Sequence, residues 1–230
     1  SLDMAQKTKF TLESEEELWT YVLTGPQDKA VVPKISGLTH YPLIIDMDLK
    51  KPTKAKIHAK DIYTHFVEPY VRLLREQVDA FSYYVLRRNV VRPIEDYFKI
   101  GVHIVFQGIC LSKSLATELK KAYLADSVVT GAIEKYKILD PDDLIDDHVM
   151  PLGANCTVIA PGQKAGVPGR YLPILKGTPQ DCEVIPREEL RNISLPEIYG
   201  FIFNHATYTK HGEAPEEKVE KEEKLAAQKP

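Results

Sequence analysis

Short apolar runs alternate with stretches of helical periodicity along the chain. Apolar, β-branched runs predict strands at Val31–Ile35, Leu43–Leu49, Phe81–Leu86, Val102–Phe106, Val158–Ala160, Tyr171–Leu175 and Cys182–Ile185. Apolar residues at helical spacing predict helices at Thr11–Leu23, Asp61–Val78, Ser112–Tyr123, Ser127–Lys137 and Leu195–Asn204. This order of elements predicts an α+β fold with a mixed or antiparallel sheet flanked by helices.

Three residues and segments refine these boundaries. Ser112 is expected to cap the helix that follows it, because its hydroxyl can accept a bond from a free N–H of the first turn. Pro69 is expected to kink the helix Asp61–Val78, because proline has no N–H to donate within a helix. We expect Pro93–Phe98 to form a helical turn or a loop.

The strand Leu43–Leu49 carries the first candidate chemistry, Asp46 and Asp48. Residues two apart in a strand project from the same face, so both carboxylates point away from Met47. Two adjacent carboxylates repel each other unless a cation lies between them, and Mg²⁺ or Mn²⁺ prefers such oxygen ligands. The alternative is a strand end at which the aspartates begin a turn.

A second candidate is His103, in the strand that begins at Val102. Val102, Ile104 and Phe106 form its core-facing row, so His103 lies on the opposite face together with Gly101. Because Gly101 has no side chain, a phosphate group could approach His103 closely. The alternative is an ordinary surface histidine.

A third candidate is Asp146, which follows two apolar residues in the segment Leu144–Val149. Its neighbour Asp147 is a second possibility for the same role, and the spacing to Val149 favours Asp146. Asp142 and Asp143 follow Pro141 and are better explained as turn or helix-cap residues.

Charge and composition narrow the function. The net charge is −3, and the charged segment Glu213–Pro230 contributes most of it. Without that segment, basic clusters remain for nucleic acid at Lys50-Lys51-Lys54-Lys56, Arg87-Arg88-Arg92 and Lys164-Arg170, although each is also typical of a solvated surface. The three scattered cysteines form no zinc spacing and are expected to be buried fillers in a reducing compartment. We expect no signal peptide, no membrane span and no membrane partner.

The order of these motifs resembles the archaeo-eukaryotic primase superfamily. The chain is most similar to the primase domain of the primase–helicases of poxviruses and related large nucleocytoplasmic DNA viruses. The resemblance covers roughly Val32 to Leu175. It is carried by the segments IIDMDL, YVLRR, KIGVHIVF and LIDDHV and by the stretch Gly162-Gln163-Lys164.

This resemblance implies an archaeo-eukaryotic primase-like catalytic domain that makes primers for DNA replication by nucleotidyl transfer from NTPs or dNTPs on a single-stranded DNA template. Asp46, Asp48 and Asp146 would be catalytic and would hold two divalent ions, Mg²⁺ or Mn²⁺. The triphosphate would be bound by His103, Lys99, Gly101, Lys164 and Arg88. The template would be bound by Lys50, Lys51, Lys54, Arg87, Arg92 and Arg170.

Two other function classes remain open: a metal-dependent nuclease and a non-catalytic single-stranded nucleic-acid-binding module. A relaxase-like initiator would need a tyrosine nucleophile beside a histidine pair, and no His-x-His occurs.

The expected domain spans residues 1–212, with residues 1–3 resembling a cloning scar. Residues 213–230 are expected to be a charged linker toward a helicase-like module in the same full-length chain. The resemblance implies an intracellular location at the viral DNA replication site, in the host cytoplasm or nucleus.

Overall fold

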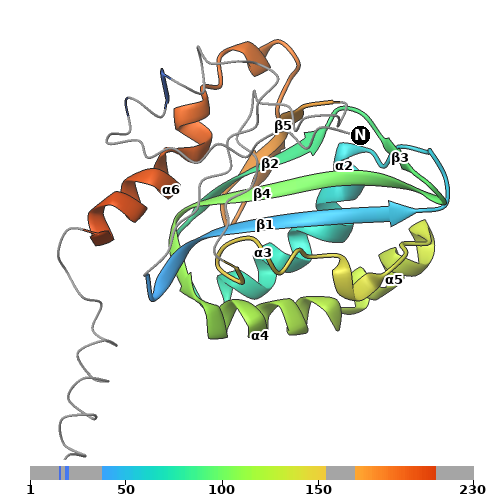
Figure 1. Ribbon diagram of the computed structural model, residues 1–230, viewed down its shortest axis with the longest axis horizontal. Coiled ribbons are helices and arrows are strands. Elements are labelled where there is room, and N and C mark those ends of the chain that lie inside the picture. Colours follow the sequence, from blue (N-terminus) through green and yellow to red (C-terminus); the bar gives the residue numbers. More distant parts are fainter. Residues whose placement is uncertain (1–15, 17–18, 21–37, 154–168, 211–230) are drawn as a thin grey trace, which may run out of the picture.

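The computed structural model describes residue 16 and the ranges 19–20, 38–153 and 169–210 (Figure 1). Its strands are β1 (His40–Lys51), β2 (Ser82–Arg88), β3 (Arg92–Ile94), β4 (Tyr97–Ser112), β5 (Tyr171–Gly177) and β6 (Cys182–Val184). Its α-helices are α2 (Ala59–Ile62), α3 (Glu68–Arg75), α4 (Lys113–Leu124), α5 (Ser127–Tyr136) and α6 (Leu195–Lys210). A π-helical segment, η1 (Tyr63–Val67), joins α2 to α3, and η2 (Pro141–Asp143) and η3 (Glu189–Arg191) are single 3₁₀ turns.

The described strands form one six-stranded sheet in which every pairing is antiparallel. Its order is β1-β4-β2-β5-β6, and β3 pairs with the end of β4. The two long strands β1 and β4 therefore lie side by side, which places the Asp-x-Asp segment directly against the histidine strand. The prediction of an α+β fold is confirmed, and of the two kinds of sheet predicted, mixed or antiparallel, the described strands form the antiparallel one.

The two faces of the sheet are covered differently. Helices α3, α4 and α5 lie along one face, and α6 lies on the other side of the sheet (Figure 1). The first face forms the main core, whose sheet residues include Leu43, Ile45, Met47, Leu49, Ile100, Val102, Ile104 and Phe106. The other face carries a second apolar cluster of Trp19, Ile44, Tyr84, Leu86, Val105, Val149, Met150, Tyr171, Ile185, Ile198, Tyr199 and Ile202. Because this cluster covers only part of its face, polar groups can occupy the rest.

Most predicted elements agree with the observed ones to within a few residues. The cap at Ser112 is confirmed, since its Oγ accepts a bond from the backbone N–H of Leu115 at 3.3 Å. The predicted helix Asp61–Val78 is the run α2-η1-α3, which ends at Arg75. Pro69 lies in the first turn of α3, directly after the π-helical segment. The missing N–H of proline removes one i to i−4 bond and thereby accounts for the irregularity there.

The prediction for Pro93–Phe98 was wrong. Arg92–Ile94 is the strand β3, and it turns through Glu95 and Asp96 into the start of β4. Because β4 is the one partner of β3 among the described strands, Pro93 needs no backbone N–H for a second neighbour there. An edge strand therefore tolerates the proline that suggested a loop.

Several predictions concern residues that the structure does not describe. These are the strands Val31–Ile35 and Val158–Ala160, the residues Lys164 and Cys156, the segment Glu213–Pro230 and most of the helix Thr11–Leu23. Cys110 and Cys182 are free thiols and are half-buried, where full burial was expected. Within the described part of the chain, no helix is both long and apolar enough to cross a membrane.

Candidate active site

Asp46 and Asp48 project from β1 on the face opposite the main core. Met47, between them, is fully buried in that core. The two aspartate side chains are 19% and 18% exposed, respectively. The same-face prediction from strand periodicity is confirmed, and the residues do not begin a turn, because β1 continues to Lys51.

The register of β1 against β4 brings the first two sequence motifs together. Asp46 is the direct partner of His103, and Asp48 is the direct partner of Gly101. Side chains of directly opposed residues on one face lie about 5 Å apart at their Cβ atoms. Pairing of the two strands thus joins segments more than fifty residues apart in the sequence into one small polar patch.

Lys99 forms an ion pair with Asp48, its ammonium Nζ donating to carboxylate Oδ2. The lysine is the register partner of Lys50, so its side chain reaches diagonally across to Asp48. In this structure the ammonium group supplies the positive charge that the acid pair requires.

His103 is almost completely buried, which differs from the surface histidine that the sequence left open. Its Nε2 lies 3.4 Å from Oδ1 of Asp46, and its Nδ1 has no hydrogen-bond partner. Burial, together with the nearby positive charges of Arg88 and Lys99, holds the pKa of His103 well below its usual value. The imidazole is therefore neutral at physiological pH and carries one N–H.

The carboxyl group of Asp46 lies in an unfavourable environment for a negative charge. Burial, followed by repulsion from Asp48 and Asp146, raises its pKa to about 8, although Lys99 and Arg88 act in the opposite direction. Its Oδ1 is buried and accepts no hydrogen bond, although Nε2 of His103 lies 3.4 Å away, which is longer than a normal N–H···O bond. A nearby cation would offset this repulsion and favour the ionised form of Asp46.

Asp146 lies beside the acid pair on the free edge of β1. Its backbone N–H donates to the carbonyl of Asp46 at 2.9 Å, and the preceding residue, Ile145, forms an isolated β-bridge with Met47. Burial alone would raise the pKa of Asp146, but hydrogen bonding from the backbone and ring of His148 lowers it. The carboxylate is therefore ionised and held in one orientation.

Asp147, the alternative third acid, points elsewhere. Its carboxylate is 66% exposed and pairs with the ammonium group of Lys120 on α4 at 2.7 Å. Lys120 also donates to the backbone carbonyl of Ile145 at 2.9 Å. The geometry thus favours Asp146 as the acid that faces Asp46 and Asp48.

Two residues near the acids were not identified from the sequence. His148 lies at the mouth of the site with its side chain 84% exposed and Nδ1 2.9 Å from Asp146. The spacing Asp-x-His, in which His148 follows Asp146 by two residues, could have indicated that the histidine contacts the carboxylate. Tyr171 stacks on His103 with ring centroids 3.5 Å apart, and no sequence pattern distinguishes it from any other strand tyrosine.

Arg88 extends the patch from β2. Its guanidinium carbon lies 4.6 Å from the centroid of the Tyr171 ring, and its Nη1 donates to the carbonyl of Gly169 at 3.1 Å. Because Arg88 acts electrostatically on both Asp46 and His103, it belongs to the same site. Of the candidate triphosphate ligands, Lys99, Gly101, His103 and Arg88 therefore lie together, and Lys164 lies outside the described residues.

The candidate DNA-binding cations do not form one surface. Lys50 pairs with Asp140 and Asp143 at 3.2 Å each, and Lys51 is buried with its ammonium group on the carbonyl of Ala55. The guanidinium group of Arg87 donates to the carbonyl of Ile57 at 2.8 Å.

These three side chains therefore tie down the loop after β1 and the segment before Asp146. Arg92 is half-buried, whereas Lys54 and Arg170 are exposed and remain available to a phosphate backbone.

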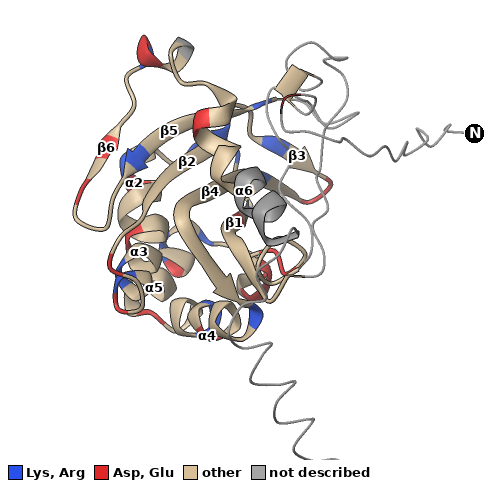
Figure 2. Cartoon of the chain, turned by 90° about the vertical axis from the view of Figure 1, so that its left-hand side faces the viewer, with Lys and Arg blue, Asp and Glu red and all other residues tan. Residues whose placement is uncertain are grey.

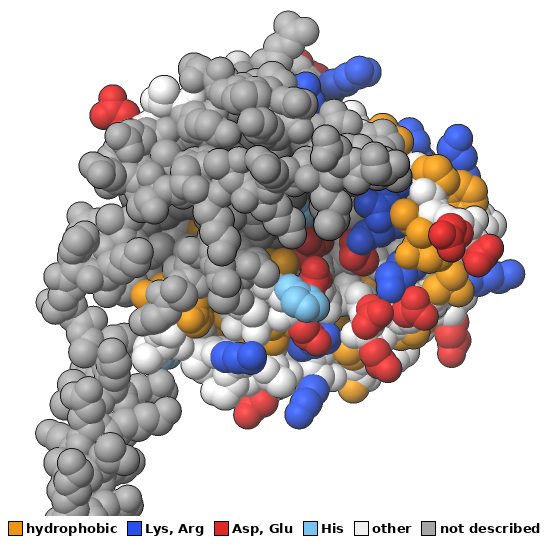
Figure 3. All heavy atoms as spheres, viewed as in Figure 1, with side chains coloured by type: hydrophobic (Ala, Val, Ile, Leu, Met, Phe, Trp, Pro, Cys, Tyr) orange, Lys and Arg blue, Asp and Glu red, His pale blue; other side chains and the backbone are white. Residues whose placement is uncertain are grey.

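Charged side chains of both signs lie on the surface of the protein. In the space-filling view, acidic side chains gather near a histidine, and Lys and Arg side chains lie beside them (Figure 3). The same mixture of signs is seen over the helices and strands in the view turned by 90° (Figure 2). This surface has positive charge next to an acidic centre, as binding of a metal–triphosphate complex requires.

Asp46, Asp48 and Asp146, here called the acid patch, offer oxygen ligands for a metal ion. Within the described ranges, no group of three or more His, Cys, Asp or Glu side chains is arranged to hold a metal ion. The chemistry of the donors nevertheless fits a hard divalent cation, because Asp46 has a buried, unpartnered oxygen beside two other carboxylates. Movement of the Lys99 ammonium group and rotation of the carboxylates would be needed to bring the ligands together.

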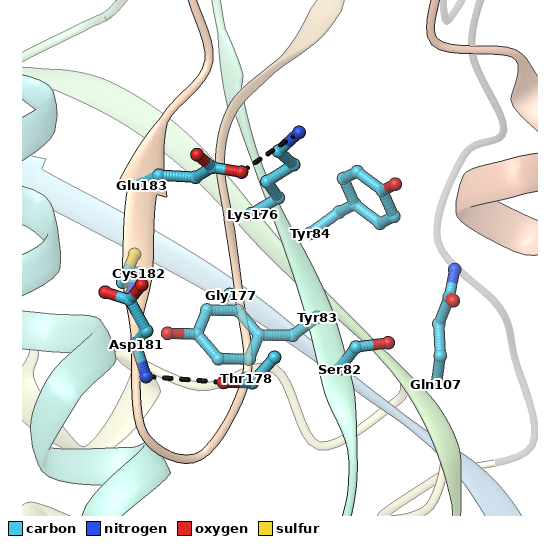
Figure 4. A pocket seen from close by; sticks show the side chains of 10 residues that line it. All are labelled: Ser82, Tyr83, Tyr84, Gln107, Lys176, Gly177, Thr178, Asp181, Cys182 and Glu183. Atoms are coloured by element: carbon cyan, nitrogen blue, oxygen red, sulfur yellow. Dashed lines mark hydrogen bonds and ion pairs between the residues drawn. The ribbon is translucent and has the colours of Figure 1, made fainter.

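A separate pocket lies at the other end of β2, where β5 turns into β6 (Figure 4). Its lining includes the ion pair of Lys176 with Glu183 and the half-buried thiol of Cys182. None of the candidate catalytic or triphosphate-binding residues lines this pocket. The acid patch therefore remains the candidate active site.

The family model for the C962R protein N-terminal AEP domain matches residues 14–157, which is more than half of the chain. The chain belongs to this family. AEP denotes the archaeo-eukaryotic primases, as the order of motifs led us to expect, and the matched range contains Asp46, Asp48, His103 and Asp146. Membership implies primase-like nucleotidyl-transfer chemistry with binding of nucleotide and nucleic acid. No curated protein matches the chain.

Proposed function

We propose that this AEP domain is a DNA-dependent primase or polymerase that makes primers for DNA replication. It would use NTPs or dNTPs and a single-stranded DNA template. The observation that carries the proposal is the register of β1 and β4, which sets Asp46 opposite His103 and Asp48 opposite Gly101, with Asp146 against the free edge of β1. Carboxylates beside phosphate-binding groups are what transfer of a nucleotidyl group requires.

In this proposal Asp46, Asp48 and Asp146 hold two Mg²⁺ or Mn²⁺ ions. The ions supply Lewis-acid stabilisation of the charge that develops on the attacking and leaving oxygens. Asp146 is kept ionised and oriented by His148, and it is ready to bind a cation without rearrangement of its backbone. Bound cations would favour the ionised form of Asp46, because their positive charge would offset the repulsion from the other two acids.

The incoming nucleotide is held by positive and N–H donors on the same face. His103 contacts the triphosphate, and Lys99 and Arg88 add charge next to it. With a metal bound to Asp48, the ammonium group of Lys99 would be able to leave Asp48 and contact a phosphate oxygen. The 3′-hydroxyl of a primer would then attack the α-phosphorus and lose its proton to solvent. A new P–O bond would form, and pyrophosphate would leave with the electrons of the broken P–O bond.

The template is proposed to follow the exposed cations Lys54 and Arg170, with a contribution from Lys164 and Arg92. Such contacts are sequence-tolerant and weaken with salt. We further propose that a helicase module follows in the full-length chain and that the protein acts at the viral DNA replication site, in the host cytoplasm or nucleus.

A tyrosine nucleophile, as in a relaxase-like initiator, is not favoured by the site. Tyr171 is the tyrosine stacked on His103, and burial, followed by the charge of Asp46, raises its pKa above the usual value for a phenol. A phenol with a raised pKa is a poorer nucleophile at neutral pH.

One assay tests the proposal against its alternatives. The protein is incubated with single-stranded DNA, Mg²⁺ or Mn²⁺ and labelled NTPs or dNTPs. Labelled oligonucleotides longer than one nucleotide would support primer synthesis, and shortening of the template would indicate a nuclease. Binding of the template without synthesis or shortening would indicate a binding module. The Asp46→Asn and Asp48→Asn double variant must abolish synthesis, whereas a double change at the exposed Asp79 and Asp142 must not.

A further inference from the structure

Tyr171 covers the histidine of the candidate site. Its ring lies over the imidazole of His103 at 3.5 Å between centroids, with the two planes inclined by only 23°. The guanidinium group of Arg88 lies over the phenol ring at 4.6 Å from its centroid. The imidazole is therefore enclosed, and its side chain is only 2% exposed.

The same tyrosine occupies the space over Gly101. A Cβ atom built on Gly101 would lie 2.1 Å from the Tyr171 hydroxyl oxygen, closer than any real contact. The sequence suggested that Gly101 leaves room for a phosphate group. In the structure this room is filled by the Tyr171 phenol, so a ligand and the tyrosine compete for one place.

The covered arrangement leaves polar groups unsatisfied. Nδ1 of His103 and Oδ1 of Asp46 are both buried and have no hydrogen-bond partner. A buried polar group without a partner destabilises the covered state relative to one in which the group is hydrogen-bonded. Buried polar atoms without partners are rare in native proteins, and here two of them belong to residues that face each other across β1 and β4. A ligand that brings oxygen atoms and positive charge would satisfy both.

The backbone that carries Tyr171 is held in place independently of the ring. Tyr171 is the register partner of Arg88, and the preceding residue, Arg170, exchanges backbone and side-chain hydrogen bonds with Asn89 at 2.9 Å. Removal of the phenol from His103 therefore requires rotation of one side chain and leaves the sheet unchanged.

We propose that Tyr171 is a displaceable cover on His103, which an incoming nucleoside triphosphate moves aside to place its phosphate oxygens against His103 and Gly101. This inference rests on the proposed nucleotide-binding function. Before nucleotide binds, only a minor fraction of molecules has Tyr171 displaced. The apparent Kd for nucleotide is therefore the intrinsic Kd divided by that fraction, so the measured binding is weaker than the intrinsic binding. Tyr171 thereby sets the affinity for nucleotide without taking part in the chemistry.

The first test measures binding of a fluorescent ATP or dATP analogue to the whole chain with Mg²⁺ and without template. Tyr171→Leu keeps an apolar side chain but cannot stack, and it should lower the apparent Kd about threefold or more. Tyr171→Phe keeps the ring and should stay closer to wild type. The matched control is Tyr84→Leu, because Tyr84 belongs to the second apolar cluster but hydrogen-bonds to Glu197 on α6. Unchanged or weaker nucleotide binding by a folded Tyr171→Leu variant would contradict the proposal that Tyr171 covers the binding site.

The second test uses the unmodified protein and does not depend on how any variant folds. In histidine-labelled protein, the ring protons of His103 should be shielded by the stacked phenol and should move downfield when the triphosphate with Mg²⁺ is added. A His103 signal that remains shielded at saturation would overturn the cover while leaving nucleotide binding intact. Failure of both wild type and Tyr171→Leu to bind any triphosphate would overturn the nucleotide-binding function itself, and the cover with it.

Discussion

Asp46 and His103 are direct register partners on adjacent antiparallel strands, and Nε2 of the histidine lies 3.4 Å from Oδ1 of the aspartate. His103 is buried and Asp46 is largely buried, and both are driven toward their neutral forms, the acid by a raised pKa and the base by a lowered one. The pair is thus held in a state that a cation and a phosphate group would convert to the charged one.

Replacement of the acid pair is the first test of the metal site. Asp46→Asn together with Asp48→Asn should abolish nucleotide incorporation. Without metal, the unfolding temperature should be unchanged or higher, because two mutually repelling carboxylates are removed. Mg²⁺ or Mn²⁺ should raise the unfolding temperature of the wild type but not of the double variant. Full activity in the double variant would contradict the assignment.

The raised pKa of Asp46 predicts a pH-dependent stability of the metal-free protein. The folded-state pKa of about 8 lies above the unfolded value of 3.8, so the folded state binds the proton more tightly. The stabilisation that the folded state gains from protonated Asp46 is complete below the unfolded pKa and is lost as the pH rises toward 8. In the presence of a chelator, the stability of Asp46→Asn relative to wild type should therefore increase as the pH rises from about 5 to about 8.

The comparison with Asp46→Asn removes the opposing effect of His103. Its lowered pKa means that stability is lost as pH falls below the usual range of histidine, and this happens in both proteins. Thermal unfolding of the two proteins across this pH range is the measurement. A difference that does not change with pH would show that Asp46 is ionised even without metal.

His103→Ala should weaken the apparent affinity for NTP and slow incorporation. The expected loss is on the order of 1.5–3 kcal/mol for one charge-assisted hydrogen bond to phosphate. Because phosphate favours the protonated imidazole, the pKa of His103 should be higher with NTP bound than without it. DNA retention without NTP, measured by fluorescence anisotropy, should be nearly unchanged. Lost DNA retention with an unchanged NTP dependence would instead place His103 in the template groove.

Lys120 should matter for the metal although it is not a ligand. It holds the carbonyl of Ile145, the residue before Asp146, so Lys120→Met should reduce the apparent metal affinity about tenfold or more. Asp147→Asn is the matched control, because it weakens the ion pair with Lys120 but leaves the bond to Ile145. The readout is the Mg²⁺ dependence of incorporation. Equal effects of the two changes would contradict a role in placing Asp146.

Two neighbouring cations should behave differently. Lys54 is exposed, so Lys54→Gln should weaken template binding and reduce its salt dependence by about one phosphate contact. Arg87 binds the carbonyl of Ile57, so Arg87→Met should lower the free energy of unfolding by about 1–3 kcal/mol. Salt titrations of DNA binding and denaturant unfolding of both variants are the measurements. If Arg87→Met lost DNA binding but kept its stability, Arg87 would be a template-binding residue after all.

The amino-acid sequence by itself determined which residues share a face and where several elements begin. Asp46 and Asp48 lie on one side of β1 because alternation along a strand is a local property of the backbone. The cap at Ser112 is equally local, since its hydroxyl binds an N–H only three residues away. The order of short motifs was also sufficient to indicate the AEP family.

Only the tertiary structure decided how these local pieces meet. The pairing of β1 with β4 placed His103 opposite Asp46, and the second apolar cluster buried a histidine that strand alternation alone put on an open face. Tyr171 and Lys120 reach the site from β5 and α4, and no local pattern marks either of them. Strand register and side-chain burial depend on contacts between distant segments, so the period of a single strand cannot specify them.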